Sequence, residues 1–175
     1  MVTIEKSKCD KYVLRSKDQH WWAVFMVSED GFVSIQSDYG DYNYCWSSIG
    51  EQTIQEFLID CNNDYLMGKF GMGLPEEINA EKTAKNIKHD IIESRRMGDI
   101  SEDLARHYFD LCENIYSINS FKEFEDYMFD SFIIDFYNDD YSSIPVAYDK
   151  PCQLKSFFEL VWPEFIEILK EEIKK

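Results

Sequence analysis

The chain has 175 residues, 45% of them hydrophobic and 16% aromatic, which is enough to bury a core, so the chain need not be disordered. Its 34 acidic residues outnumber 18 basic ones, and the net charge of −16 opposes binding to nucleic acid and to anionic membranes. No apolar run approaches the roughly 18 residues of a membrane span, and the charged start of the chain does not resemble a secretory signal. Together with five scattered cysteines, which suit reduced, mostly buried thiols, these features predict a cytoplasmic protein.

The negative charge is unevenly distributed. Residues 1–28 carry five bases and three acids, whereas residues 29–75 carry eight acids and one base, and residues 116–150 carry eight acids and two bases. Such a surface either only keeps the protein soluble or attracts a basic partner over a long range. Both interpretations stay open from the sequence.

The first fifty residues predict β-strands. The stretch "WWAVFMV" (21–27) is apolar on both faces, which is typical of a central strand covered on both sides. Turns at "EDG" (29–31) and "DYGD" (38–41) separate it from two further strands, so we expect an antiparallel meander of three or four strands. The predicted strands are 11–16, 21–27, 32–37 and 42–47.

The remainder predicts four or five helices with apolar positions at helical spacing. The predicted helices are 51–69, 80–97, 102–115, 121–137 and one from about 152, which Pro163 should kink or split. The fold class is therefore α+β, with an N-terminal sheet packed by C-terminal helices. We expect a single domain, 1–175, in which 1–70 form the sheet and first helix, a Gly/Pro linker follows at 71–75, and 76–175 form the helical part.

Catalytic and metal-binding patterns are weak in this sequence. It lacks HExxH, CxxC, an EF-hand loop, a GxSxG elbow and a phosphate-binding glycine loop. We therefore expect no enzyme and no cofactor. One alternative is a structural zinc ion bound by dispersed ligands, such as Cys9 or Cys45 with His20.

Tyrosines beside aspartates favour a protein-binding surface, because they combine rigid aromatic area with charge that steers a partner. Tyr44 and Trp46 share one face of their predicted strand, and for Trp46 we expect a place in the core. The residues that we predict to contact a partner lie in the turn and in "YNDDYSS" (137–143): Asp38, Tyr39, Asp41, Asp139, Asp140 and Tyr141.

The stretch "WWAVFMVSEDGFVSIQSDYGDYNYCWSSIG", followed by "FLIDCNNDYLMGKF", resembles a group of small acidic phage and prophage proteins. They share a tryptophan strand, a hairpin of the form "dG…I.SDYG.Y.Y.W…G", and "DYL..K"; "RRMGDISEDLARHYFDL" resembles their continuation. The likeness covers roughly residues 21–115. It implies an anti-CRISPR type inhibitor in the host cytoplasm, one that binds a basic nucleic-acid-handling surface of a host CRISPR effector nuclease, or of another basic defence protein, and blocks loading of target DNA.

Two alternatives come from other classes of protein. The first is a phage adaptor or regulatory protein that binds another basic protein. The second is a metal-dependent enzyme acting on guide RNA through acids near Asp38 and Asp41. We expect neither direct nucleic-acid binding nor membrane binding.

Overall fold

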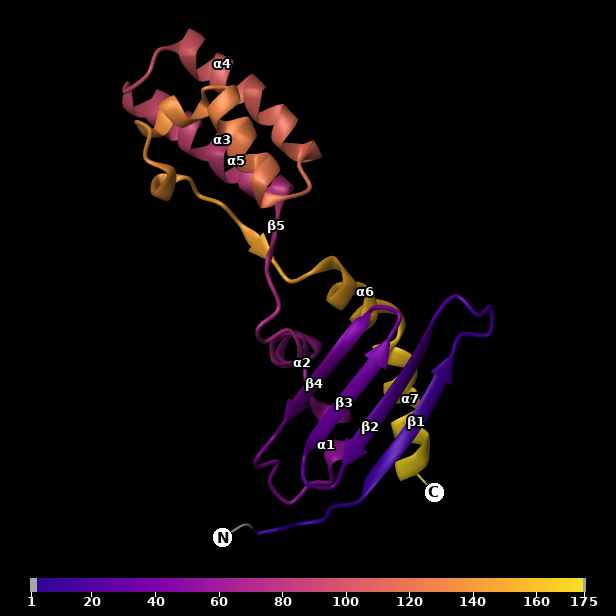
Figure 1. Ribbon diagram of the computed structural model, residues 1–175. Coiled ribbons are helices and arrows are strands. Elements are labelled where there is room, and N and C mark those ends of the chain that lie inside the picture. The colour runs from indigo at the N-terminus through magenta and orange to yellow at the C-terminus, as the bar shows by residue number, and fades with distance from the viewer. Residues whose placement is uncertain (1–2, 175) are drawn as a thin grey trace. The chain divides into compact units, whose positions relative to one another are not determined.

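The computed structural model describes residues 3–174, which form two compact units (Figure 1). The first, called here the sheet unit, consists of residues up to 74 together with those from 150 onward. The second, the helical unit, consists of residues 75–149 and is inserted into the sheet unit between α2 (Asn63–Phe70) and α6 (Cys152–Leu160). The fold is α+β, as the sequence predicts.

The sheet unit begins with a four-stranded antiparallel meander. Its strands are β1 (Cys9–Arg15), β2 (Trp22–Ser28), β3 (Phe32–Ser37) and β4 (Gly40–Cys45), and they pair in this order. One row across the sheet joins Tyr12, Phe25, Ile35 and Tyr42. Because side chains alternate along a strand, these residues all project from the same face. The predicted meander is confirmed.

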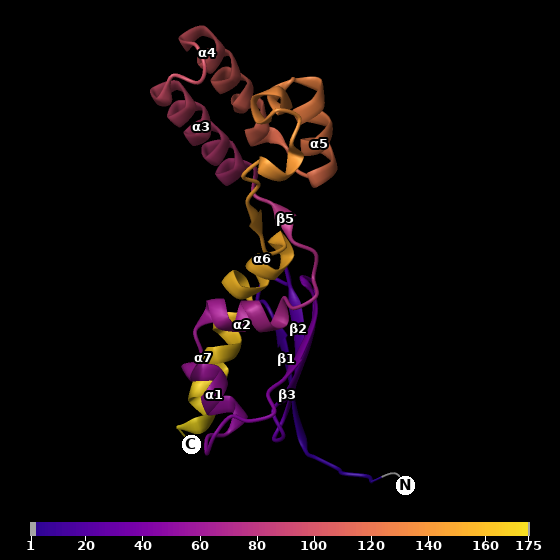
Figure 2. The same cartoon turned by 90° about the vertical axis from the view of Figure 1, so that its left-hand side faces the viewer.

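Four helices cover this face of the sheet: α1 (Ile54–Asp60), α2, α6 and α7 (Trp162–Ile173) (Figure 2). The fully buried Phe25 stacks on Phe165 of α7, with ring centroids 3.8 Å apart and planes 9° from parallel. Phe157 and Trp162 contact the same ring in tilted arrangements. Burying one such side chain contributes about 1.5–3 kcal/mol, so this aromatic cluster is a main source of stability for the unit.

The other face of β2 is not covered within the structure described. Trp22 and Val24 are half-buried, and Met26 is 41% exposed. The prediction that both faces of this strand are covered is therefore wrong. An apolar pattern shows that side chains can be buried, but it does not show that a covering layer exists.

The helical unit has its own core. Its elements are α3 (Ala80–Met97), α4 (Glu102–Leu111), the 3₁₀ helix η1 (Cys112–Ser117), α5 (Phe121–Asp130), the 3₁₀ helices η2 (Ile133–Tyr137) and η3 (Tyr141–Ser143), and a ribbon of β5 (Glu77–Ile78) with β6 (Tyr148–Asp149). Ile87, Ile91, Phe124 and Met128 lie at the centre of this core. The ribbon brings the first and last residues of the unit side by side.

Local signals explain where the helices start and stop. Gly98 ends α3 in the left-handed conformation with φ 87°, and the hydroxyls of Ser101 and Ser120 cap α4 and α5, as the sequence predicts. The last predicted helix is split at Val161, with Pro163 in the first turn of α7.

Three other predicted helices are shorter than expected. Helix 51–69 is two helices, because Cys61 is extended and the Asn62 side chain accepts from the Asp64 N–H to start α2. Helix 102–115 passes into η1 after Leu111, and helix 121–137 breaks at Phe132, which has φ 60°. These interruptions fall inside continuous apolar patterns, so periodicity alone did not locate them.

The division of the chain also differs from the sequence-based one. Residues 150–174 belong with the sheet, whereas the sequence grouped them with the helical part that starts at 76. That the whole chain folds as a single domain stays a prediction. Among residues 3–174, no helix has the length and apolar character needed to cross a membrane.

Cavity-forming substitutions in the two cores should act locally. Phe25 belongs to the core of the sheet unit and Phe124 to that of the helical unit, and the two cores have no member in common. We expect Phe25→Ala and Phe124→Ala each to cost about 3–5 kcal/mol. Hydrogen exchange should then accelerate only in the substituted unit. Faster exchange throughout the chain in both variants would show one cooperative domain instead.

Candidate protein-binding surface

The hairpin turn that follows β3 uses two of its predicted contact residues to hold its own shape. The carboxylate of Asp38 accepts a hydrogen bond from the Trp22 N–H at 2.9 Å, and the Asp38 N–H donates to the Trp22 carbonyl at 3.3 Å. The carbonyl of Tyr39 accepts from the Tyr42 hydroxyl. Asp41 is exposed and pairs with Gln36 through its backbone, and among residues 3–174 its carboxylate has no hydrogen bond or ion pair. The turn is therefore first a structural element.

The hairpin signature and the "DYL..K" segment meet in one cluster. Trp46 is 6% exposed, and its indole N–H donates to the Tyr65 hydroxyl at 3.1 Å. The ammonium group of Lys69 lies 5.2 Å from the ring centroid of Tyr44 and 5.4 Å from that of Tyr65, within cation–π range. A Cβ on Gly31 would come within 2.2 Å of the Trp46 carbonyl oxygen, which explains a glycine there. Trp46 is buried, as predicted.

The second predicted segment lies in the helical unit. The Asp140 carboxylate accepts hydrogen bonds from the Ser142 N–H at 3.0 Å and from the hydroxyls of Ser142 and Ser143 at 2.6 Å each. These bonds favour the ionised form and hold the pKa of Asp140 below its usual value. Asp139 is exposed and adopts a left-handed conformation with φ 60°. The two predicted segments belong to different units.

Tyr141 connects this segment to an exposed aromatic surface. Its ring stacks on Phe129, with centroids 6.1 Å apart and planes 16° from parallel, and it meets Phe121 edge-on. Phe121 also contacts Tyr148 at 6.1 Å. Phe121, Phe129 and Tyr148 are 39%, 56% and 46% exposed. We call Phe121, Phe129, Tyr141 and Tyr148 the aromatic face.

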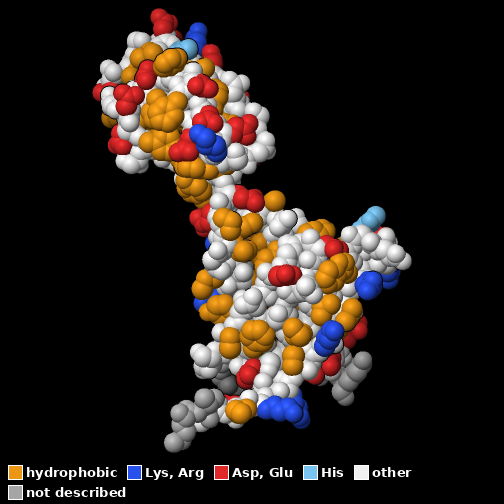
Figure 3. All heavy atoms as spheres, in the orientation of Figure 1, with side chains coloured by type: hydrophobic (Ala, Val, Ile, Leu, Met, Phe, Trp, Pro, Cys, Tyr) orange, Lys and Arg blue, Asp and Glu red, His pale blue; other side chains and the backbone are white. Residues whose placement is uncertain are grey.

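The helical unit, which carries the aromatic face, is strongly acidic. Residues 121–143 contain seven acids and one base, and the helical unit as a whole contains eighteen acids and seven bases, a net charge of −11 out of −16. Figure 3 shows hydrophobic side chains grouped on the helical unit with acidic ones around them. Exposed aromatic area and a large excess of acidic charge thus lie on the same unit.

Phe132 adds a second unusual feature, three residues beyond Phe129. It follows the C-cap of α5 in the left-handed conformation, φ 60° and ψ 18°, where glycine is the favoured residue. Its side chain is 65% exposed. Neither burial nor backbone geometry favours a phenylalanine there, and such residues concentrate at functional sites.

Sequence reasoning missed most of this surface. In the predicted helix 121–137, Phe121 and Phe132 fall at helical spacing with Phe124 and Met128, which predicts one apolar stripe, yet both are exposed. Phe129 lies outside the stripe made by Phe124 and Met128, so an apolar residue out of phase was the available signal. Tyr148 carried no such signal.

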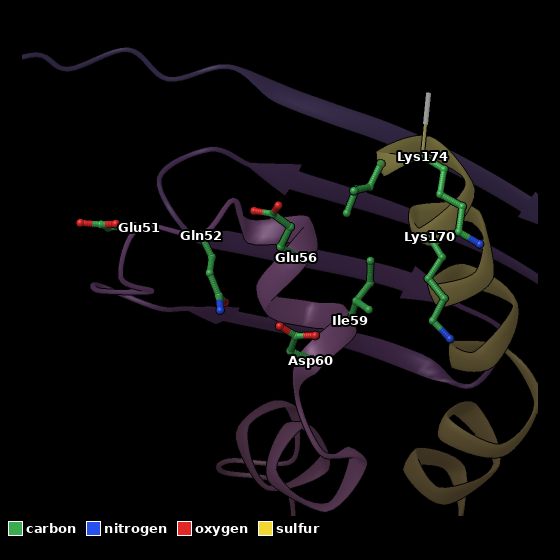
Figure 4. Close-up of a pocket in the computed structure, with 8 residues that line it drawn as sticks. Glu51, Gln52, Glu56, Ile59, Asp60, Lys170 and Lys174 are labelled. Atoms are coloured by element: carbon green, nitrogen blue, oxygen red, sulfur yellow. The ribbon is translucent and has the colours of Figure 1, made fainter.

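A hollow of about 540 Å³ lies in the sheet unit between α1 and α7. Figure 4 shows Glu56 and Asp60 on one side of it and Lys170 and Lys174 on the other. The Glu56 carboxylate accepts from the N–H and hydroxyl of Thr53, which lowers its pKa, and Lys170 pairs with Glu167 at 2.7 Å. Two of its charged groups thus serve the helices themselves.

The alternative zinc site is not assembled. Cys9 and Cys45 lie at the end of the sheet next to the β2–β3 turn, whereas His20 lies in the β1–β2 turn and pairs with Asp18. A strand of this length separates the two ends by about 20 Å. Within residues 3–174, no three His, Cys, Asp or Glu side chains form a group suited to a metal ion. Cys9, Cys45 and Cys152 are exposed, so the expectation of mostly buried thiols is wrong.

Comparison with known proteins identifies the lineage. A family model described as a phage family, Phage_phiTE_072, matches residues 2–171. The chain therefore belongs to this phage protein family. Neither the curated proteins nor the solved structures contain a match to the chain.

Replacing Phe132 should reveal its backbone strain. We expect Phe132→Gly to raise the free energy of unfolding by about 1 kcal/mol, because glycine adopts the left-handed conformation without the Cβ clash. Phe132→Ala removes the same ring but keeps the Cβ, so it should not stabilise the protein. Urea unfolding of the two variants checks this. Equal stability of the glycine and alanine variants would contradict the explanation.

The Tyr141 hydroxyl is buried and has no hydrogen-bond partner among residues 3–174. Burial raises the pKa of Tyr141 to about 12, with Glu125 adding to the effect. We expect Tyr141→Phe to raise the free energy of unfolding by about 1 kcal/mol at pH 7. In the wild type, stability falls from pH 10 to 12, because the unfolded chain releases this proton first; the variant should lose less.

Tyr137→Phe is the matched control. The Tyr137 hydroxyl donates to the Asp90 carboxylate at 3.1 Å, so its removal should lower the free energy of unfolding by about 1 kcal/mol. Urea unfolding at pH 7 compares the two variants. A series of pH values up to 12 compares the wild type with Tyr141→Phe only, because burial also raises the pKa of Tyr137. A loss of stability in Tyr141→Phe at pH 7 would mean that its hydroxyl is satisfied.

Proposed function

We propose that this phage protein is an inhibitor of a host defence nuclease, of the anti-CRISPR type, which acts by stoichiometric binding and not by catalysis. Its membership of a phage family agrees with this role. The observation that carries the proposal is the aromatic face, which exposes large apolar rings within a helical unit of net charge −11. The partner in this proposal is a basic protein of the host cytoplasm.

A basic nucleic-acid channel is the surface that such a face would complement. RNA-guided nucleases hold the guide–target duplex in a positively charged channel and read a short flanking duplex with arginines. Phe129 and Phe132 supply anchors that can insert between basic side chains, while Asp126 and Asp130 on α5 supply charges that attract them. Occupation of the channel would prevent target DNA from loading. No step of this mechanism requires a metal or a cofactor.

Binding to a purified CRISPR effector nuclease tests the proposal. We expect the chain to co-migrate with the effector in size-exclusion chromatography and to block target DNA in a gel-shift assay, while the guide RNA stays intact. Phe129→Ser with Phe132→Ser should weaken binding at least tenfold, because hot-spot anchors carry most of the affinity. Because acidic charge speeds the encounter, higher salt should slow association markedly.

Asp41→Asn is the control, because Asp41 is an exposed acid of the sheet unit. Loss of binding in this control alone would place the contact at the hairpin turn. Co-migration with a basic phage or host protein outside any defence complex would favour the adaptor alternative. Cleaved guide RNA with bound metal would favour the enzyme. Lack of co-migration with every defence complex tried would refute the proposed function.

A further inference from the structure

A second surface of the helical unit has the opposite character. An open groove of about 440 Å³ runs between α3 and α4, which are joined by the short turn after Met97. Its apolar floor includes Ile92, Ala105 and Phe109, and Ile92 is 40% exposed. We name it the arginine groove, after the residues at its rim: Arg95, Arg96 and Arg106.

The groove has the form of a vacant helix-packing site. Helix α3 faces the core through Ala84 and Ile87, and the buried Ile91 belongs to the core and also lines the groove. Ile92 on α3, with Ala105 and Phe109 on α4, forms a second apolar strip between the two helices. A pair of antiparallel helices with such a strip is the arrangement into which an amphipathic helix docks, with apolar side chains at positions i, i+4 and i+7.

The arginines of the chain are concentrated at the arginine groove. The whole chain has four arginines, and three of them line the groove. Arg95 on α3 and Arg106 on α4 face the same carboxylate, Glu102, at 3.8 and 3.7 Å, which are too long for hydrogen bonds. One carboxylate thus serves two guanidinium groups, whose side chains stay 47% and 74% exposed. Each guanidinium keeps donors for a further carboxylate, which it can bind in a bidentate manner.

The residues that line the arginine groove have more basic than acidic side chains, unlike the helical unit as a whole. The residues lining the groove include three arginines against Glu102 and Asp110, whereas the unit as a whole has a net charge of −11. A nucleic acid would meet these two carboxylates and the surrounding negative field, and the apolar floor would give its phosphates no partner. A peptide with carboxylates beside apolar side chains satisfies both the floor and the rim.

We propose that the arginine groove docks an amphipathic helix of a partner protein, one whose apolar stripe is flanked on both sides by Asp or Glu. Apolar side chains of this helix lie against Ile92, Ala105 and Phe109. Carboxylates on one flank bind Arg95, and those on the other flank bind Arg106. Arg96 already pairs with Glu93 at 2.6 Å and adds positive charge to the rim. The site goes beyond the proposed function, because the aromatic face selects a basic partner and this groove selects an acidic one.

A pair of designed peptides tests the chemistry directly. The first is a helix of about 18 residues, long enough to form in water, with leucines at i, i+4, i+7 and i+11 and glutamates on both flanks. The second is identical except that lysines replace the glutamates. Fluorescence anisotropy with the full chain measures both affinities. We expect the glutamate peptide to bind at least tenfold tighter than the lysine peptide.

Variants of exposed groove residues assign the binding to this site. Ile92→Glu should abolish it, and Arg95→Glu with Arg106→Glu should reverse the preference toward the lysine peptide. Glu102→Gln should strengthen binding of the glutamate peptide severalfold, because it removes the carboxylate that the guanidinium groups share. Circular dichroism and thermal unfolding confirm that each variant is folded.

Several results would overturn the proposal. These are failure of both peptides to bind, equal or tighter binding of the lysine peptide, unchanged affinity in Ile92→Glu, or displacement of the glutamate peptide by single-stranded DNA. Phe129→Ser with Phe132→Ser, the variant that tests the proposed function, should leave peptide binding unchanged. A failure here is therefore distinguishable from a failure of the proposed function.

Discussion

The sheet has an apolar inner face that residues up to 74 cover only in part, and the rest of the structure depends on this constraint. The stack of Phe25 on Phe165 shows how it is met: the ring on β2 is covered by helices from the far end of the chain. The sheet unit therefore needs residues from both sides of the 75-residue insertion to bury its inner face. The ribbon of β5 and β6, with Asn79 donating to the Asp149 carboxylate at 2.8 Å, joins the two ends of that insertion.

The large aromatic core and most of the net negative charge lie in different units. The sheet unit holds the large aromatic cluster and has sixteen acids against eleven bases, whereas the helical unit holds most of the net negative charge. Within the helical unit the charge is divided again, because residues 121–143 have one base among seven acids while three arginines line the groove of α3 and α4. An insertion of this kind can change its surface without disturbing the sheet, since its own core holds it together.

The signature that identifies the lineage turns out to be largely architectural. Gly31 leaves room for the Trp46 carbonyl, Asp38 continues the pairing with Trp22, and Lys69 lies over Tyr44 and Tyr65. Sequence reasoning placed Trp46 in the core for the right reason, which is strand alternation. It could not tell that Asp38 and Tyr39 hold the turn, because that depends on which backbone groups the turn brings near them. Of the second segment, Tyr141 lies in an aromatic surface whose other members were not predicted.

The sequence by itself determined the strands, the turns, most helix starts and the α+β class, because these depend on local periodicity, capping residues and glycine conformation. Its hairpin motif also indicated the phage lineage, which the family model shows. Only the tertiary structure decided which apolar residues stay exposed. Val24 and Ile35 are alike in pattern, yet Ile35 is buried and Val24 is not, because helices cover one face of the sheet. Likewise, Phe124 fills a core while Phe129, on the same helix, faces solvent. Burial depends on contacts between distant segments, which a pattern within one segment does not contain.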